Sequence, residues 1–502
     1  MQRMSPLDAS FLHIENDHNH MHIGSVAVFE GPPPAYAEIR AMVEGKLPLV
    51  PRYRQTVRPV PLGLGRPVWV DDPHFYLPYH LRQTALPSPG GEQQLRNLVG
   101  RVMAQQLDRT RPLWEMWVAE GLDEGRWALI SKTHHAMVDG VSGTELLSIV
   151  LDTERDVKPT RVVGFSPERQ PSGTELAAES VARRLVSPYE QVRSLRAVTR
   201  TPRAFAGHLG EAAKGLVSMR SLLRPTPASS INGPIGPHRR WSWARTRMSD
   251  VKAVRTALGG TVNDVVLTII ANGFRELLLS RGEPVEKLEI RTLVPVSVRS
   301  PNQEGSYDNQ VSAMFATLPI GIADPVERLA SMRRQMDHLK SSKQAVAGEV
   351  LTSMSGFAPS MLLALGIRVA SRIPQRNVNT VTTNVPGPRQ PLYAAGRRML
   401  EAFPYVPLAG TVRVGVAIFS YDGALNYGVT GDYDTMPDLA VLCRGIEDGL
   451  EELLEVAGAS ERAAEQPAAA AVGRTGGKGK GRRRARSAST SNGGGRTPTK
   501  SR

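Results

Sequence analysis

The stretch HHAMVDG, residues 134–140, determines which fold we expect for this chain, because it joins two contrasting patterns. The apolar run WALISKT, residues 127–133, precedes it and predicts a buried strand. The run VSGTELLSIVLD that follows has apolar residues at helical spacing. The stretch is therefore predicted to connect a strand to a helix, a position where loops hold functional groups on a rigid scaffold.

Two adjacent histidines give this connection its chemistry. An imidazole has an ordinary pKa of about 6.5, so a neutral ring is available at pH 7 to take a proton from a hydroxyl or a thiol. Asp139 can fix the loop by ion pairing or by accepting backbone hydrogen bonds, and Gly140 permits a sharp turn. The alternative is that His134 and His135 are ordinary histidines, one in the core and one at the surface. The Asp-Gly pair at this spacing favours a functional loop over that alternative.

The composition bounds the class of protein. The 502 residues, 41% of them hydrophobic and 22% charged, can form packed cores, which excludes wholesale disorder and a long coiled coil. The single cysteine, Cys443, excludes an intramolecular disulfide framework and fits a reducing compartment. The start of the sequence lacks the apolar core of a signal peptide, and no window of about 20 residues is apolar enough to span a bilayer. We therefore expect a cytoplasmic protein that is soluble or peripherally bound to a membrane.

The net charge of +14 is concentrated in two segments. Residues 474–502 hold ten basic residues and no acidic one, and residues 181–224 have a net charge of +7, which leaves −3 for the rest of the chain. We expect residues 474–502 to bind anionic partners, either nucleic acid or a membrane surface. Residues 181–224 carry Leu and Val at helical spacing, which predicts either a solvated surface helix or one that faces lipid.

Four regions follow from these patterns. We predict an N-terminal lobe at 1–154, a linker with basic helical segments at 155–237, a C-terminal lobe at 238–457 and a disordered basic tail at 458–502. Strand-like runs mixed with helical patterns in both lobes predict an α/β architecture. The predicted strands are 23–29, 127–133, 289–296, 311–318, 379–383, 412–420 and 424–430, and the predicted helices are 92–106, 141–151, 262–279 and 439–456.

The histidine motif matches the HHxxxDG pattern of the acyltransferase superfamily that includes chloramphenicol acetyltransferase and peptide-synthetase condensation domains. Further motifs in family order over residues 5–456 resemble the bacterial wax ester synthase/acyl-CoA:diacylglycerol acyltransferase family, in particular its actinobacterial triacylglycerol synthase branch. They are SPLDASFL at 5–12, MHIGSVAVFEG at 21–31, WVDDPHFYLPYHL at 69–81, RPLWE at 111–115, NDVVL at 263–267, VPVSVR at 294–299, TTNVPGP at 382–388 and FSYDGALNYGVTGDYDTMPD at 419–438.

This resemblance implies a two-lobed fold of chloramphenicol-acetyltransferase type, with mixed sheets flanked by helices and an active site in a channel between the lobes. It implies acyl-CoA as a co-substrate with no other cofactor, and diacylglycerol or a long-chain alcohol as the acceptor. It also implies association with the inner membrane face or with lipid droplets. By position in the motif, His135 resembles the general base, Asp139 the residue that holds the loop, and His134 a supporting residue.

The other site candidates also come from the resemblance. Thr382, Thr383 and Asn384 are candidate donors to the oxyanion, and the alternative for them is a polar strand end before a Pro-Gly turn. Asn263 and Asp264 match the family's Asn-Asp motif, and the alternative for them is helix capping. Pro112-Leu113-Trp114 is predicted to be scaffold, and Arg299 to pair with Asp139.

Direct attack of the alcohol on the thioester is the expected chemistry. The sequence has no Gly-x-Ser-x-Gly elbow, and Cys443 falls in a predicted packed helix, so an acyl-enzyme intermediate is disfavoured. His18, His20 and His22 are predicted to share one strand face, but no carboxylate cluster completes a metal site, so we expect no metal.

Two other functions remain as alternatives. One is a transferase of the same superfamily that uses a carrier-bound acyl group or another acceptor. The other is a catalytically inert lipid- or nucleic-acid-binding homologue, against which the intact motif argues.

Overall fold

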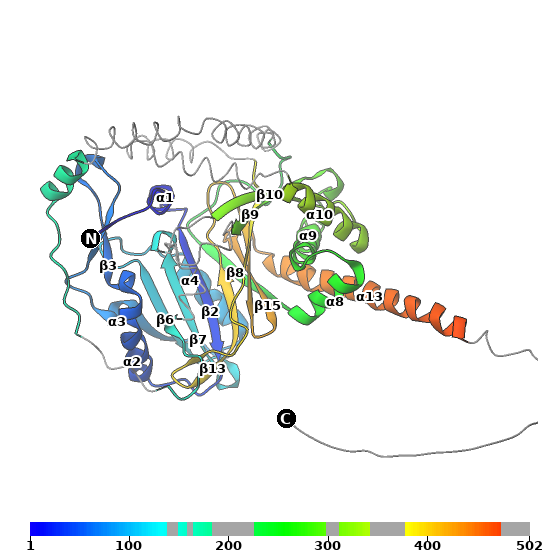
Figure 1. The fold of residues 1–502 in the computed structure, drawn as a ribbon, viewed down its shortest axis with the longest axis horizontal. Coiled ribbons are helices and arrows are strands. Elements are labelled where there is room, and N and C mark those ends of the chain that lie inside the picture. Colours follow the sequence, from blue (N-terminus) through cyan, green and yellow to red (C-terminus); the bar gives the residue numbers. More distant parts are fainter. Residues whose placement is uncertain (138–148, 158–163, 183–224, 298–310, 342–376, 473–502) are drawn as a thin grey trace, which may run out of the picture. The chain divides into compact units, whose positions relative to one another are not determined.

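The computed structural model describes residues 1–137, 149–157, 164–182, 225–297, 311–341 and 377–472. Residues Met1–Ala457 form one compact unit, and Gly458–Arg502 form a second. The described residues of the first unit form two six-stranded sheets and one three-stranded sheet, shown with the helices in Figure 1.

The first six-stranded sheet has the order β12-β13-β2-β7-β6-β5, and all neighbours are antiparallel except β5 and β6. Its central strand β7 is buried at nearly every position, which explains its continuous apolar sequence. The strands are β2 (His22–Phe29), β5 (Leu81–Ala85), β6 (Trp114–Glu120), β7 (Trp127–His134), β12 (Tyr393–Ala394) and β13 (Arg397–Tyr405). The helices of this part of the chain are α1 (Pro6–Ile14), α2 (Tyr36–Lys46), α3 (Leu77–His80) and α4 (Glu92–Met103).

The second six-stranded sheet has the order β10-β9-β11-β14-β15-β8, and β11 is parallel to both of its neighbours. Its strands are β8 (Arg239–Arg247), β9 (Ile290–Ser297), β10 (Val311–Leu318), β11 (Thr380–Val385), β14 (Val414–Tyr421) and β15 (Ala424–Asp432). The helices in this part of the chain are α8 (Met248–Leu258), α9 (Val262–Ser280), α10 (Pro325–Ser341) and α13 (Leu439–Val472). Both sheets are mixed and are accompanied by helices, as predicted.

A three-stranded sheet of order β1-β4-β3 completes the strands of the described residues. Its members are β1 (Gln2–Arg3), β3 (Gln55–Arg58) and β4 (Val68–Asp71). Short 3-10 helices connect the larger elements: η1 (Leu47–Leu49), η2 (Pro51–Arg54), η3 (Pro61–Gly63), η4 (Asp123–Gly125), η5 (His135–Met137) and η7 (Val285–Lys287).

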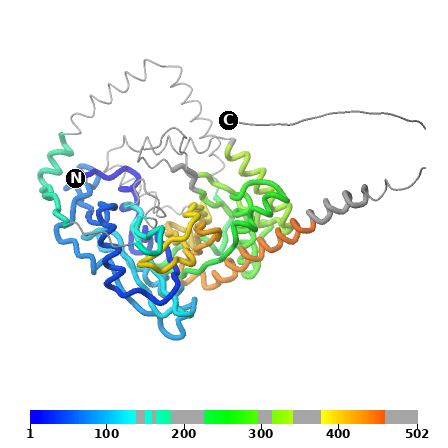
Figure 2. The backbone as a smooth tube through the Cα atoms, turned by 60° about the horizontal axis from the view of Figure 1, so that its bottom comes forward, coloured from blue at the N-terminus to red at the C-terminus, as the bar shows by residue number. Residues whose placement is uncertain are grey.

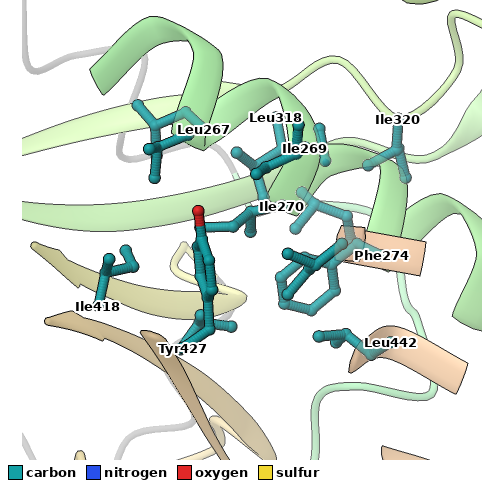
Figure 3. Packing of buried hydrophobic residues seen from close by; sticks show 14 of the residues in the cluster. Leu267, Ile269, Ile270, Phe274, Leu318, Ile320, Ile418, Tyr427 and Leu442 are labelled. Atoms are coloured by element: carbon teal, nitrogen blue, oxygen red, sulfur yellow. The ribbon is translucent and has the colours of Figure 1, made fainter. Parts of the chain in front are cut away.

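Helix α9 forms the centre of the second core. Thr261 and Asp264 cap its N-terminus reciprocally, and thirteen of its residues are buried. Figure 3 shows Ile269, Ile270 and Phe274 packed toward Tyr427 of β15, with Leu442 of α13 beside them. Among the described residues no single helix is long and apolar enough to cross a membrane, and only α8 and α9 together pass that test, with a bend of 103° between them.

Two features differ from the predicted boundaries. Strands β12 and β13 come from the predicted C-terminal lobe, but β13 pairs with β2 of the predicted N-terminal lobe. In Figure 2 this yellow segment lies between the blue-to-cyan and the green parts of the chain. Helix α13 continues to Val472, beyond its predicted end at 456, so the predicted tail 458–502 begins as helix. Its continuation is rich in alanine, the best helix former. Residues 473–502 lie outside the described residues.

Candidate active site

The histidine motif lies at the end of β7, where His134 ends the strand and His135 begins the turn η5. The His134 N–H donates to the Leu113 carbonyl at 2.9 Å, and the His135 N–H donates to the Met21 carbonyl at 2.8 Å. These two bonds fix the turn between the residues that precede β6 and β2. The rest of the motif, with Asp139 and Gly140, lies outside the described residues.

His134 is buried, and its two ring nitrogens face different protein groups. Its Nδ1 accepts a hydrogen bond from the Ala136 N–H at 3.0 Å, which assigns the ring proton to Nε2. That Nε2 lies 3.5 Å from Oε2 of Glu15. In this arrangement the ring braces the turn that carries His135.

Glu15 directly follows α1, and its side chain is only 3% exposed. Nε of Arg109 donates to Oε2 of Glu15 at 2.9 Å, and Nε2 of His22 lies 3.5 Å from Oε1. Burial opposes ionisation of this carboxyl, but interactions with His134, His22 and Arg109 outweigh burial and hold the pKa of Glu15 well below its ordinary value. Burial lowers the pKa of His22 to about 3, so His22 is neutral at pH 7. The cluster is therefore a buried carboxylate whose charge is balanced by Arg109.

His135 is partly buried and stacks on Phe11 of α1. The ring centroids are 4.0 Å apart and the ring planes meet at 23°. Burial lowers the pKa of His135 to about 4, so the ring is neutral at pH 7. Its Nδ1 has no hydrogen-bond partner in any other described residue. This Nδ1 is itself buried, so a substrate hydroxyl could reach the neutral ring only at its other nitrogen, Nε2, which would accept the proton.

The Pro-Leu-Trp motif contacts the strand β7 and the turn that follows it. Leu113 provides the carbonyl that holds the His134 N–H, and Trp114 pairs with Thr133 of β7. The Trp114 ring stacks between Tyr53 and His80, with centroids at 4.4 and 4.7 Å. These contacts are consistent with the scaffold role that the sequence predicts.

The candidate residues of the second sheet lie at the end of β11 and at the start of α9. Nδ2 of Asn384 donates to Oδ1 of Asn263 at 3.5 Å, so the structure brings these two candidates together. Asp264 is buried and accepts from the Thr261 N–H at 2.8 Å, which is the capping role given above as the alternative. Thr382 is also buried and its hydroxyl is bonded to that of Thr292 at 2.7 Å. Thr383 is partly buried, and Asn384 is exposed.

A shared hydrophobic cluster connects the two groups of candidates. Phe419 and Tyr421, at the end of β14, belong to the same buried cluster as Ala136 and Met137 of η5. Val385 of β11 is in register with Phe419. Among the described residues, no hydrogen bond joins His135 to Asn263, Thr382, Thr383 or Asn384. Arg299, the predicted partner of Asp139, lies outside the described residues.

The sequence patterns predict no role for Glu15, Phe11 or Arg109. Phe11 lies in SPLDASFL and Arg109 in Leu107-Asp108-Arg109, and both stretches match the family. The local signal is weak: a glutamate that follows an amphipathic helix is usually a surface residue. Glu15 becomes part of the site only through its contact with His134, which lies 119 positions later in the sequence.

The three histidines considered for a metal site do not form one. His18 is exposed, whereas His20 and His22 are buried and stack with centroids 5.7 Å apart. Nε2 of His20 lies 3.3 Å from the Pro237 carbonyl. The described ranges contain no group of three His, Cys, Asp or Glu side chains placed to hold a metal ion.

Two family models match the sequence. Residues 4–266 match the wax ester synthase/diacylglycerol acyltransferase catalytic domain, and residues 307–454 match the WS/DGAT C-terminal domain. A probable diacylglycerol O-acyltransferase of Mycobacterium tuberculosis is 37% identical over 458 residues, which cover 91% of this chain and 96% of that protein.

Solved structures give the same result for the fold. The wax ester synthase/diacylglycerol acyltransferase from Marinobacter aquaeolei is 25% identical with a TM-score of 0.65, over 91% of this chain and all of that chain. Trichothecene 15-O-acetyltransferase from Fusarium sporotrichioides, at 11% identity, has a TM-score of 0.58 over 90% of this chain and 94% of its own, which shows a shared fold alone. The predicted CoA-dependent acyltransferase fold is confirmed.

Proposed function

The chain belongs to the wax ester synthase/diacylglycerol acyltransferase family, and we propose that it transfers a long-chain acyl group from acyl-CoA to diacylglycerol, giving triacylglycerol. Long-chain alcohols, which would give wax esters, are the second acceptor class. The observation that supports this reaction best is the neutral His135 ring, which stacks on Phe11. His135 directly follows β7, and hydrogen bonds from the His134 and His135 N–H groups to the Leu113 and Met21 carbonyls fix its backbone.

His135 acts as the general base in the reaction that we propose. Its neutral ring takes the proton of the acceptor hydroxyl as the hydroxyl oxygen attacks the thioester carbonyl. The tetrahedral intermediate then collapses, the carbon–sulfur bond breaks, and the imidazolium returns the proton to the departing CoA thiolate. A positioned base of this kind contributes about 10²–10⁴-fold to the rate.

His134 and Glu15 act as positioning residues in this mechanism. The Nδ1 of His134 holds the Ala136 N–H and so shapes the turn, while Glu15 faces the protonated Nε2 and favours that tautomer. Asp139 and Gly140 complete the loop by resemblance to the family motif. Direct transfer is favoured over an acyl-enzyme because burial raises the pKa of the Cys443 thiol to about 12.

Asn384 is the most suitable of the oxyanion candidates. Its amide is exposed and makes one long bond to Asn263, so it can turn toward a ligand. Thr382 is committed to Thr292 inside the sheet, and Asp264 caps α9. A donor aimed at the tetrahedral oxyanion is worth about 10²–10³-fold.

We also propose that the protein binds peripherally at a membrane or lipid-droplet surface. Diacylglycerol and its product are apolar lipids, so the acceptor is found at such a surface. Two basic segments, 181–224 and 474–502, can supply attraction to anionic headgroups.

The test is CoA release from palmitoyl-CoA with diacylglycerol by wild type and His135→Ala. We expect the variant to lose about 10²–10⁴-fold in rate and to keep its circular dichroism and thermal midpoint. Wild-type activity in His135→Ala would contradict the base assignment. Activity with acyl-carrier-protein donors but not with acyl-CoA would instead favour the carrier-dependent alternative.

A further inference from the structure

Lys132 of β7 is a buried cation that the mechanism above does not use. Its side chain is fully buried, and its Nζ donates to the Val102 carbonyl at 3.0 Å and to the Gln105 carbonyl. Both of these partners are main-chain oxygens and not carboxylates. Lysine is rarely buried in full without an ionic partner, because an ammonium loses its hydration there. Packing alone therefore does not account for a lysine at this position.

The two carbonyls lie at the end of α4. Val102 is in the last turn of that helix and Gln105 follows it, where carbonyls lack the usual helical partner and a positive charge is favourable. Gly24 of β2, which is in register with Lys132, permits the close approach: a β-carbon there would lie 2.4 Å from Cε of Met103, the last residue of α4. The lysine thus fixes the end of α4 against the strand that leads into the histidine turn.

The chain that leaves α4 at this point contacts the histidine turn. Within residues 104–113, Nε of Arg109 donates to Oε2 of Glu15 at 2.9 Å, and the Leu113 carbonyl accepts from the His134 N–H at 2.9 Å. An anchor at the start of this loop therefore restrains two of the groups that hold the turn.

Charged and titratable groups face the ammonium from several elements. Glu115 of β6 is in register with Lys132, but Arg82 of β5 donates to the Glu115 carboxylate at 3.0 Å. Glu15 attracts the ammonium, and by the same interaction the ammonium favours the ionised form of Glu15. The groups whose charges interact with that of Lys132 are Glu15, His20, His22, Arg82 and Glu115.

The interior disfavours the charge of Lys132. Burial lowers its pKa to about 8, and attraction to Glu115 and Glu15 offsets this only in part. Most molecules still carry the ammonium at pH 7. Because the unfolded chain binds this proton more tightly than the native one, the charge lowers the free energy of unfolding at that pH. A cation that weakens the fold beside the proposed base points to a role in the site.

We propose that Lys132 is a positioning residue for the proton acceptor: its ammonium anchors the end of α4 and keeps Glu15 ionised opposite His134. The carboxylate of Glu15 then faces the Nε2–H of His134, and the Nδ1 of His134 holds the Ala136 N–H and so shapes the turn that carries His135. The inference rests on the proposed function, because it concerns the base of that reaction.

The experiment compares wild type, Lys132→Met and Arg328→Met with palmitoyl-CoA and diacylglycerol as substrates. It measures kcat, KM for acyl-CoA and the thermal midpoint. Methionine keeps an unbranched apolar side chain and removes the ammonium. Arg328 of α10 is the matched control, because it is also a buried cation, 2% exposed, whose guanidinium donates to the Ile322 and Ala323 carbonyls.

We expect Lys132→Met to lose about 10²-fold in kcat, the scale of a misplaced catalytic group, with little change in KM for acyl-CoA. Its thermal midpoint should equal or exceed that of wild type, because an apolar group replaces a buried charge. Arg328→Met should keep the wild-type kcat. Wild-type kcat in Lys132→Met would overturn the proposal. A loss of kcat with a lower thermal midpoint, or an equal loss in Arg328→Met, would show a general effect on the fold and would also overturn it.

The pH dependence of kcat tests the charge itself, and it does so even if Lys132→Met fails to fold. The kcat of wild type should fall as the pH rises through about 8, because the ammonium of Lys132 becomes a neutral amine. The fall should be absent in Lys132→Met and weaker in Glu15→Gln, in which no carboxylate remains to be kept ionised. A wild-type kcat that is constant up to about pH 9, or an equal fall in Glu15→Gln, would overturn the proposal.

Failure of the proposed function gives a different result from failure of this inference. No CoA release by wild type with diacylglycerol or with a long-chain alcohol would contradict the proposed function, and the role of Lys132 with it. Equal CoA release by wild type and Lys132→Met would leave the proposed function intact and show that Lys132 does not position the base.

Discussion

At the end of β7, His134 is held by Ala136 and Glu15, and Glu15 in turn is held by Arg109 and faces His22. At the end of β11, the exposed Asn384 side chain makes one hydrogen bond to another described residue, at 3.5 Å to Asn263. The turn that carries the proposed base is therefore held by several contacts, whereas the proposed oxyanion donor has one side-chain partner among the described residues. A proton acceptor needs a rigid support, while an oxyanion donor needs an N–H that is available to the ligand.

After the loss of His135 itself, the largest effect in this comparison is expected from Asn384→Ala. Loss of an oxyanion donor lowers kcat by about 10²–10³-fold, and because Asn384 is exposed the thermal midpoint should not move. Steady-state kinetics with palmitoyl-CoA and diacylglycerol, together with thermal unfolding, measure both quantities. Thr383→Val is the matched control on the neighbouring position, and a kcat for Asn384→Ala within twofold of wild type would remove Asn384 from the mechanism.

Glu15→Ala should disturb the turn that carries His135 and lower both kcat and the stability of the fold. Misplacement of the turn that carries His135 is expected to lower kcat by about 10²-fold with little change in KM for acyl-CoA. The free energy of unfolding should also fall, since Arg109, His22 and His134 lose their buried partner. Glu15→Gln keeps an acceptor oxygen for His134 and should recover part of kcat.

Glu168→Ala, which removes an exposed carboxylate paired with the N-terminus, is the control for this pair. If Glu15→Ala unfolds more easily but retains wild-type kcat, Glu15 is a stability residue and has no positioning role.

A smaller, pH-dependent effect is expected at Phe11. Burial lowers the pKa of His135 to about 4, so kcat/KM of wild type should fall on acidification only near that pH. Phe11→Ala exposes the ring, and the acid limb should move up toward the ordinary histidine pKa of about 6.5. Initial rates between about pH 4 and 8 measure this shift, and an unchanged acid limb in Phe11→Ala would refute the assignment of that limb to His135.

The free energy of unfolding should also depend on pH. His135 and His22 have native pKa values of about 4 and about 3, below the ordinary value, so the unfolded chain binds more protons than the native one between about pH 6.5 and 3. The free energy of unfolding should therefore decrease as the pH falls through this window. Urea unfolding at several pH values checks it, and His22→Phe should show a weaker decrease; equal slopes would exclude His22 as a contributor.

The smallest effect is expected at Cys443. This thiol is buried in α13, and burial raises its pKa to about 12, so it is neither a nucleophile nor a ready target for alkylation. Cys443→Ala should keep kcat within about twofold, because the change removes one buried atom from the second core. Trapping of an acyl-thioester on Cys443 during turnover would contradict direct transfer.

Local sequence pattern predicts most of the strands that frame the site. The expected strands at 23–29, 127–133, 311–318 and 424–430 agree with β2, β7, β10 and β15 to within two residues at each end. The same patterns do not predict several other strands, among them β6, β8 and β13. Strand β13 reads RRMLEAFPY, and its proline and lack of regular alternation make a weak strand signal. The place of β8 and β13 in the sheets depends on partners far along the chain, such as β2 for β13.

The candidate site, too, has features that local sequence predicts and others that only the folded structure shows. The two histidines, the strand before them and the order of the family motifs are local features, and they are sufficient to identify the superfamily and the reaction. The contacts of Glu15 and Phe11 with the turn, and the choice of capping for Asp264, join residues whose proximity no local pattern encodes.

The sequence by itself thus determined the family, the α/β fold with mixed sheets and the His-His turn at a strand end, because these depend on residue order and on short-range periodicity. Only the tertiary structure decided that burial lowers the pKa of His135, that the carboxylate of Glu15 lies beside His134, and that β13 joins the first sheet. The physical reason is that burial, ionisation and strand pairing depend on which distant segments meet after folding.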